Sequence, residues 1–417
     1  MISLNEGHSI MKYSARILDH SVVVFLLVVL PATPAAQASA LKTLILDKEM
    51  LEQIHTGYVK KDKAYQRVVQ KILDESNRLL NQNPLSVVDK FATPPSGDKH
   101  DFMSMAPYFW PDSSKKDGLP YIQRDGERNP EIYSFTDQDY LSRTLDESQL
   151  LAITYFITGD AKYAMKAADR IRVWFLNEKT RMNPNMNHAQ FVRGKNEGRG
   201  TGLIQTKDLH KVLDAIVILR NSKEWTRTDD QNIHKWFEEY FTWLTTHQYG
   251  IDESKRENNH GTWYDVQAAS IALFLGKEEF AKTLLETAKE KRVASQIAND
   301  GRLPNELRRT RSWHYSCMNL SAFMHLALLG EHVHVDLWNY QSKQGGSIRK
   351  ALDYLLPFIS DSSKWGYKQI TPFHTESESV WFLHIAEKKY DKKRYSSDWL
   401  KKISSDKNTI SVYDLFY

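Results

Sequence analysis

The chain has 417 residues, of which 41% are hydrophobic and 26% are charged, as in an ordinary soluble globular protein. The formal net charge of +4 is too small for the basic face of a nucleic-acid-binding protein, although it permits an anionic substrate. Aromatic residues make up 12% of the chain, and 11 Trp and 20 Tyr can serve both a core and carbohydrate-stacking surfaces. The single cysteine, Cys317, excludes an intrachain disulfide.

The amino terminus has the pattern of a secretory signal peptide. Basic residues precede an apolar run over residues 22–30, and small residues follow, ending in Ala36-Gln37-Ala38. This order of parts is typical of a signal peptide, and the apolar run is too short to span a bilayer. We therefore expect residues 1–38 to be removed on export, with Met11 as an alternative start, and the mature protein to be periplasmic or secreted.

Residues 39–417 are expected to form a single, predominantly helical domain. Apolar residues recur at helical spacing from about residue 140 onward, and short breaks such as Thr158-Gly159-Asp160 divide the helices into pairs. The predicted pairs begin near residues 140, 205, 261, 312 and 375, without a clear strand pattern. Stacked antiparallel pairs favour an α/α toroid. A long solenoid is the alternative, but the pairs lack the self-similarity expected of one.

Two segments precede the regular pairs. Residues 41–82 are predicted to be helical, with a charged middle at Lys60-Lys61-Asp62-Lys63. Residues 83–137 contain about half of the 13 prolines, and a stretch this long without helical spacing is usually either disordered or functional. Its aromatic residues argue against disorder, so we expect an ordered loop region that lines a site.

The first chemically rich stretch is Asn258-Asn259-His260-Gly261-Thr262-Trp263-Tyr264-Asp265, which precedes a helix that is apolar on nearly all sides. Asparagine is a good N-cap, and capping explains one of the two asparagines. A histidine at a helix N-terminus lies at the positive end of the helix dipole, which favours the neutral imidazole that a general base requires.

The second stretch is Glu306-Leu307-Arg308-Arg309-Thr310-Arg311-Ser312-Trp313-His314-Tyr315. Arginine binds a carboxylate with two parallel hydrogen bonds, although a solvated helix face is the better interpretation for at least one of the three arginines. A tyrosine beside a cation can have a lowered pKa, and a phenol so placed can move a proton in either direction.

Two further groups are candidates for substrate contacts. Asn196-Glu197-Gly198-Arg199-Gly200-Thr201-Gly202 lacks the Lys-Ser/Thr of a phosphate loop, so its glycines are expected to allow another segment to approach Arg199 closely. The proline-rich region adds Lys99, His100, Tyr108 and Trp110.

Other classes of function remain open at this point. A glycoside hydrolase needs a pair of carboxylates, and Asp146-Glu147, Glu238-Glu239 and Glu376 with Glu378 are available. The first two pairs fit solvated faces or caps better. A non-catalytic carbohydrate-binding protein would share the aromatic residues. No metal site is expected, because His332 and His334 lack a metal-binding context.

Taken together, four motifs resemble the alginate lyase domain superfamily, which includes polysaccharide lyase families 5 and 38. They are residues 96–104 with 107–111, 196–202, 258–265 and 306–315, in the expected order within about residues 95–385. The resemblance is closer to family 38, where alginate and glucuronan lyases are found. It implies an all-α fold, an (α/α) toroid built as an incomplete barrel of about six or seven antiparallel helix pairs. It also implies cleavage of a 1,4-linked polyuronate by β-elimination.

The resemblance also implies roles for residues. The Asn-His pair of the family falls on Asn259 and His260, its tyrosine on Tyr315, and its arginine on Arg309, which keeps the Glu-Leu-x-Arg pattern. Arg308 and Arg311 remain alternatives for the arginine. The expected substrate is an anionic polysaccharide, alginate before glucuronan, bound by a monomer without a cofactor and without nucleic-acid or membrane partners. The other expected substrate-binding residues are Lys99, His100, Tyr108, Trp110, Arg199, Asn258, Trp263, Tyr264, Arg311 and His314.

Overall fold

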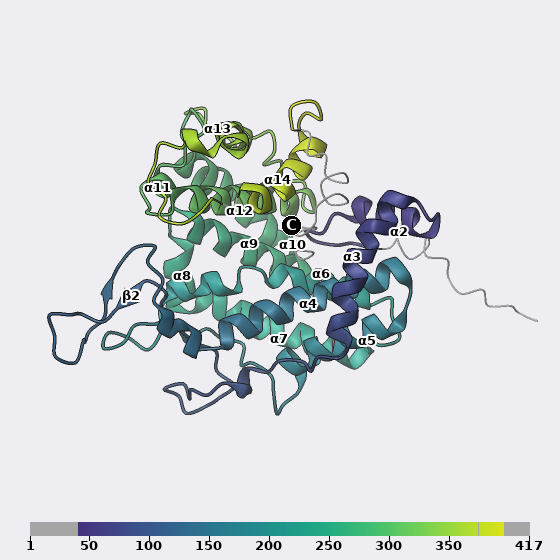
Figure 1. Ribbon diagram of the computed structural model, residues 1–417, viewed down its shortest axis with the longest axis horizontal. Helices are drawn as coiled ribbons and strands as arrows, with labels where there is room; N and C mark the ends of the chain where they lie inside the picture. The colour runs from purple at the N-terminus through teal and green to yellow at the C-terminus, as the bar shows by residue number, and fades with distance from the viewer. Residues whose placement is uncertain (1–40, 374, 396–417) are drawn as a thin grey trace, which may run out of the picture.

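The computed structural model describes residues 41–373 and 375–395 (Figure 1). The predicted signal peptide, residues 1–38 with its alternative start at Met11, lies outside these ranges. Within the described ranges, no helix is both long enough and apolar enough to cross a lipid bilayer.

The predicted α/α toroid is confirmed. Helices α4, α6, α9, α12 and α14 pack against one another in chain order and form the inner layer, and α5, α7, α10 and α13 cover them (Figure 1). The inner helices are α4 (Asp137–Thr158), α6 (Leu209–Leu219), α9 (Asn259–Phe274), α12 (Ser312–Glu331) and α14 (Thr375–Lys389). The outer helices are α5 (Ala161–Ile171), α7 (Arg227–Thr246), α10 (Glu278–Ala288) and α13 (Ile348–Ser360). The predicted pair that begins near residue 375 extends beyond the described residues, so the number of pairs stays a prediction.

Local chemistry explains the breaks within pairs. Gly159 ends α4 in the left-handed conformation with φ 73°, which glycine adopts without a Cβ clash. The side chain of Asp160 then accepts a hydrogen bond from the main-chain nitrogen of Lys162 and begins α5. The inner helix α9 is buried on nearly all sides, as its even apolar character predicts, and α12 is buried in the same way.

The single helix predicted over residues 41–82 is wrong in one respect. The segment forms two helices, α2 (Lys48–Val59) and α3 (Lys63–Leu80). Lys61 has φ 58°, and the side chain of Asp62 accepts a hydrogen bond from the main-chain nitrogen of Ala64, at 2.8 Å, so a new helix begins there. The charged middle is therefore a turn.

The proline-rich region, residues 83–137, contains short strands that the sequence pattern did not predict. Strand β1 pairs in parallel with β4, and β2 pairs antiparallel with β3 in a hairpin that projects beside α8 and α11 at the left of Figure 1. The strands are β1 (Met103–Met105), β2 (Phe109–Trp110), β3 (Ile122–Gln123) and β4 (His188–Phe191). The short helices are α8 (Gln248–Ser254), α11 (Pro304–Leu307), η1 (Val87–Asp89), η2 (Pro130–Ser134), η3 (Arg172–Leu176), η4 (Gly200–Thr206), η5 (Lys289–Ala294) and η6 (Ser362–Lys364). We call residues 107–128 the covering hairpin.

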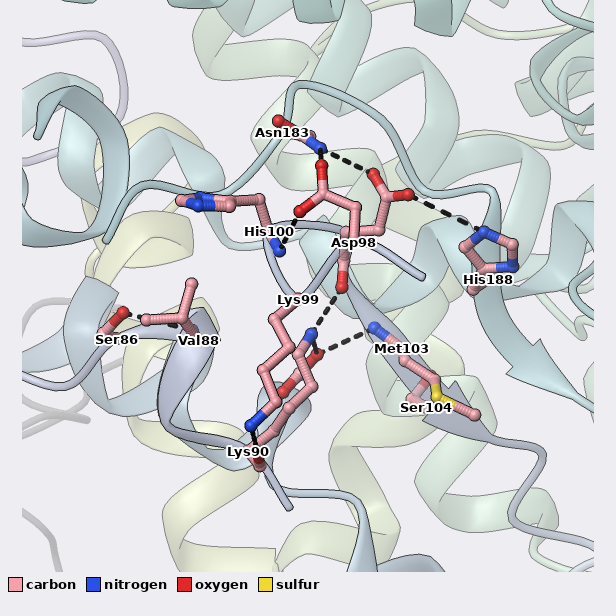
Figure 2. Close-up of polar contacts among 12 residues, drawn as sticks. Ser86, Val88, Lys90, Asp98, Lys99, His100, Met103, Ser104, Asn183 and His188 are labelled. Atoms are coloured by element: carbon pink, nitrogen blue, oxygen red, sulfur yellow. Dashed lines mark hydrogen bonds and ion pairs between the residues drawn. The ribbon is translucent and has the colours of Figure 1, made fainter. Parts of the chain in front are cut away.

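A buried ion pair joins the proline-rich region to the first inner helix. The ammonium of Lys90 is 2.5 Å from a carboxylate oxygen of Asp137 and also donates to the main-chain oxygen of Asp101. The same oxygen of Asp137 accepts from the main-chain nitrogen of Met103 at 2.8 Å (Figure 2). Burial raises the pKa of Asp137 to about 6, and burial lowers the pKa of Lys90. The pair fixes the start of β1 against the start of α4.

Lys90→Met is expected to lower the free energy of unfolding by about 3–5 kcal/mol near pH 8, because the Asp137 carboxylate then stays buried without its counter-ion. Near pH 5 the loss is expected to be smaller. Without Lys90, burial raises the folded-state pKa of Asp137 further above its unfolded value. The folded protein then keeps the proton on Asp137 at low pH, and its stability falls only as the pH rises. Urea denaturation at both pH values measures the two losses.

Lys99→Met is the control, since it removes an exposed ammonium that donates to the main-chain oxygen of Lys90 at 3.0 Å. Its expected change is within about 0.5 kcal/mol. Equal losses at the two pH values in Lys90→Met would contradict the assignment to Asp137.

Candidate active site

A pocket of about 870 Å³ lies where the inner helices begin. Gln138 in the first turn of α4, Asp208 before α6, Asn258 before α9 and Arg311 before α12 all line it. Each helix N-terminus carries a positive partial charge, because its first main-chain N–H groups have no partner within the helix. Four such ends therefore favour an anion in one pocket.

Charged side chains strengthen this preference. The pocket is lined by seven cationic residues and two anionic ones, whereas the whole chain has a net charge of only +4. The cationic residues are Arg128, Arg199, Lys207, Lys211, Arg256, Arg309 and Arg311, and the anionic residues are Asp125 and Asp208. Positive charge is thus concentrated at this place.

Asn259 and His260 lie within the first turn of α9 rather than before it. The side chain of Asn258 is the N-cap and accepts from the main-chain nitrogen of His260 at 3.2 Å. Asn259 is buried, and its side-chain amide donates to Oε2 of Glu306 at 2.9 Å while its main-chain nitrogen donates to Oε1 at 2.6 Å. Burial raises the pKa of Glu306, against the hydrogen bonds from Asn259. Glu306 therefore fixes the orientation of Asn259.

His260 has a carboxylate partner that sequence reasoning missed. Its Nδ1 contacts Oε1 of Glu253, which lies in α8 and is 1% exposed. A carboxylate on Nδ1 selects the tautomer that carries a proton there and leaves Nε2 as an acceptor. The ring lines the pocket. The available signal was an acidic residue in the short segment before the motif, because a catalytic imidazole needs an orienting group.

The hydroxyl of Tyr315 contacts the covering hairpin. Its Oη donates to Oη of Tyr108 at 2.8 Å, and Arg311 donates to the same oxygen of Tyr108 at 3.3 Å. Burial raises the pKa of Tyr315, and the contact with Tyr108 adds to this, while Arg309 and Arg311 lower it. The net direction is upward, so the lowered pKa expected from the neighbouring cations is wrong: burial outweighs them.

The three arginines of the second stretch differ in position. The guanidinium carbon of Arg309 lies 4.0 Å from the centre of the Tyr315 ring, and this arginine lines the pocket together with Arg311. Arg308 is exposed, donates to the main-chain oxygen of Pro304 at 3.1 Å and is not part of the pocket lining. The geometry therefore favours Arg309 as the arginine that acts on Tyr315.

Arg199 reaches the pocket through a tightly packed segment. A Cβ placed on Gly198 would lie 1.9 Å from the main-chain oxygen of Asn187, so only glycine allows this approach. Arg199 donates to the side chain of Gln190 at 2.8 Å, and burial lowers its pKa to about 10. The other predicted residues that line the pocket are Tyr108, Asn258, Trp263, Arg311 and His314.

The structure does not bring four predicted substrate-binding residues to the pocket. Lys99 bonds to the main chain of Lys90, and His100 donates from Nδ1 to the main-chain oxygen of Arg181 at 2.6 Å, within the cluster around Asp98 and Asn183 (Figure 2). The motif at residues 96–101 folds against residues 181–188 instead of the pocket. The other two are Trp110, which donates to the main-chain oxygen of Glu127, and Tyr264, which donates to that of Leu244.

Sequence reasoning also missed the inner end of the pocket. The rings of His210 and His325 are in a T-shaped contact with centres 4.9 Å apart, and the ring centre of His325 lies 4.5 Å from that of Trp381. Tyr315 and His325 are ten positions apart on α12 and both line the pocket, so the pocket extends about 15 Å along this helix into the barrel. The available signal was an imidazole within each of two apolar helices.

Two of the three carboxylate pairs considered for a glycoside hydrolase lie outside the pocket lining. Glu147 pairs with Arg170 at 2.7 Å, Asp146 with Lys211 at 2.7 Å, and Glu238 with Lys277 at 3.0 Å. None of these three carboxylates lines the pocket. The side chains of residues 376 and 378 lie outside the described ones.

Comparison with known proteins places this toroid among the polysaccharide lyases. The alginate lyase family matches residues 86–365. The crystal structure of an alginate lyase from Bacteroides ovatus is 34% identical, with a TM-score of 0.84 over 90% of this chain and 99% of that one. The chain belongs to the alginate lyase family.

More distant structures share the fold. A variant of alginate lyase A1-III, an enzyme of Sphingomonas species A1, in complex with a tetrasaccharide is 14% identical, with a TM-score of 0.51 over 84% of this chain and 90% of that one. At this identity the similarity shows the fold alone. A comparison with curated protein sequences finds no significant match.

Proposed function

We propose that this lyase cleaves 1,4-linked polyuronate, alginate before glucuronan, by β-elimination and leaves a 4,5-unsaturated uronate at the new non-reducing end. The observation that carries the proposal is the arrangement of His260 and Tyr315 in one cationic pocket, with Arg309 against the tyrosine ring. The converging helix N-termini suit a substrate with a carboxylate on every sugar.

The elimination removes the C5 proton and breaks the bond from C4 to its glycosidic oxygen, and a double bond forms between C4 and C5. The C5 proton is weakly acidic beside an ionised carboxylate. Neutralising that carboxylate lowers the barrier, because it stabilises the enolate-like charge of the transition state. Asn259, with Arg309 or His260, would supply this neutralisation.

The two candidate bases suit different sugars. In mannuronate or glucuronate the C5 proton and the leaving oxygen lie on the same face, so Tyr315 would act as base and then as acid. In guluronate they lie on opposite faces, so His260 would take the proton while Tyr315 protonates the leaving oxygen. The raised pKa of Tyr315 keeps it protonated for the acid role, and the cations beside it oppose that rise in the base role.

Incubation with polymannuronate, polyguluronate, glucuronan and hyaluronan tests the proposal. Only a lyase produces the ultraviolet absorbance of an unsaturated uronate. A hydrolase would release reducing ends without that absorbance, and a binding protein would release neither. A folded sample that forms no unsaturated product on any of the four polymers would reject the proposal, and product from glucuronan alone would move the substrate away from alginate.

Glu253→Gln is expected to lower kcat on polyguluronate by about 10²–10⁴-fold, which is the contribution of a general base. A glutamine amide can donate to Nδ1 of His260 and so favour the tautomer whose Nε2 cannot accept the C5 proton. On polymannuronate, where Tyr315 is the proposed base, the loss is expected to stay within about tenfold. Rates of unsaturated product from the two polymers measure the difference.

Glu257→Gln is the matched control, because Glu257 is an exposed neighbour of the same segment outside the pocket lining. It is expected to behave as wild type on both polymers. Equal losses on the two polymers in Glu253→Gln would argue against a role through His260.

We also propose that the enzyme is exported. The support is the basic region, the short apolar run and the small-residue site within residues 1–38. Sequencing the amino terminus of protein recovered from the periplasm or the medium tests it, with the mature chain expected to begin after Ala38.

A further inference from the structure

We infer that Asp125, on the covering hairpin, is the positioning residue that holds the guanidinium of Arg309 over the ring of Tyr315. The inference rests on the proposed function and extends it by one residue. No motif contains Asp125, which is separated from Arg309 by 184 positions in the sequence.

The carboxylate of Asp125 accepts hydrogen bonds from two successive residues, Arg309 and Thr310. Its Oδ1 accepts from Nη2 of Arg309 at 2.7 Å and from Nε at 3.2 Å. Its Oδ2 accepts from the main-chain nitrogen of Thr310 at 3.1 Å and from the hydroxyl of Thr310 at 3.0 Å. Two bonds from one guanidinium to one carboxylate fix the plane of the guanidinium as well as its position.

The position of the guanidinium matters because the ring of Tyr315 lies beneath it. The guanidinium carbon is 4.0 Å from the centre of the Tyr315 ring, and a cation over the ring favours the phenolate that forms when the hydroxyl gives up its proton. A free arginine side chain has many rotamers, so the contact needs an anchor. Asp125 is ionised and able to serve as that anchor. Burial raises its pKa, but the hydrogen bonds from Arg309 and Thr310 outweigh burial and hold the pKa below its ordinary value.

A different role for Asp125 would be to tether the covering hairpin, which also carries Tyr108. A substitution of Thr310 distinguishes the two roles. Its hydroxyl donates to the main-chain oxygen of Asp125 at 2.7 Å as well as to the carboxylate, so Thr310→Val weakens the tether and leaves the pair between Asp125 and Arg309 in place.

The test is the pH profile of kcat on polymannuronate for Asp125→Ala, Asp125→Asn and Thr310→Val. Asp125→Ala is expected to lower kcat on the order of 10²-fold, with a smaller change in KM, because a misplaced catalytic group costs about that much. The rising limb of its kcat profile is expected to move to higher pH, because the phenolate of Tyr315 loses the neighbouring cation of Arg309. Asp125→Asn keeps an acceptor for Arg309 but removes the neutralising charge, so its limb is expected to move to lower pH.

Thr310→Val is expected to keep the wild-type profile. The inference is overturned if Thr310→Val reproduces the profile of Asp125→Ala, or if both Asp125 variants keep the wild-type limb. Thermal unfolding checks each variant, and if Asp125→Ala does not fold, the near-isosteric Asp125→Asn decides by the direction of its shift. A folded wild type that forms no unsaturated product rejects the proposed function and this inference together, whereas an active wild type with unchanged variants rejects the inference alone.

Discussion

Tyr315→Phe is expected to lower kcat on polymannuronate by about 10⁴-fold, at the upper end of what one general acid–base group contributes, because the hydroxyl is proposed to act both as base and as acid. Binding is expected to change little. The phenylalanine ring can still lie under the guanidinium of Arg309, which is 4.0 Å from the tyrosine ring centre, and only the bond from Oη to Tyr108 is lost.

The measurement pairs the rate of unsaturated product with calorimetric binding of a mannuronate oligosaccharide. Tyr163→Phe is the control. Tyr163 lies on α5 outside the pocket lining, and its hydroxyl donates to the side chain of Asn77 at 2.8 Å. Its activity is expected to match the wild type. If Tyr315→Phe keeps activity within about tenfold of the wild type, Tyr315 does not carry the proton steps.

His260→Ala is expected to separate the two sugars. On polyguluronate the loss in kcat is expected to be about 10²–10⁴-fold, because the C5 proton of guluronate lies on the face opposite the leaving oxygen, where Tyr315 is not the proposed base. On polymannuronate it is expected to stay within about tenfold. Initial rates on block polymers of each type give both values, and a uniform loss would assign His260 to binding the carboxylate instead.

A double variant makes this test sharper. If Glu253 acts through the imidazole, adding Glu253→Gln to His260→Ala is expected to leave the polyguluronate rate unchanged, since the partner is already gone. His334→Asn is the control for loss of an imidazole, because His334 is exposed and has φ 59°, a conformation that asparagine tolerates. An additive loss in the double variant would mean that Glu253 acts independently of His260.

The inner helices were predictable because their information is local. The spacing of apolar residues and the break at Gly159-Asp160 depend on neighbours within a few positions, and the structure places α4 and α5 on either side of that break. The strands of the proline-rich region were not predictable in this way. Strand β2 has two residues, too few for an alternating pattern, and its pairing depends on a partner more than ten residues away.

The candidate site divides along the same line. His260, Tyr315 and Arg309 stand in motifs, so the sequence predicted them, and the structure brings them to one pocket. The groups that orient them come from distant or featureless segments, as Glu253 and Asp125 do. Lys99 and His100 show the opposite error: both stand close to Tyr108 in the sequence, but a turn bonded to residues 181–188 directs them to another surface.

The convergence of four helix N-termini acts on products as much as on substrate. The proposed β-elimination shortens the polymer but destroys no carboxylate, so each fragment leaves with the charges that attracted the polymer. Peptide dipoles are fixed and cannot be switched off between turnovers, so departure works against the same field that aids arrival. Dissolved salt weakens that field for both events, slowing capture and hastening release. The ionic strength at which such an enzyme works fastest is therefore the one that balances capture of the polymer against release of the products.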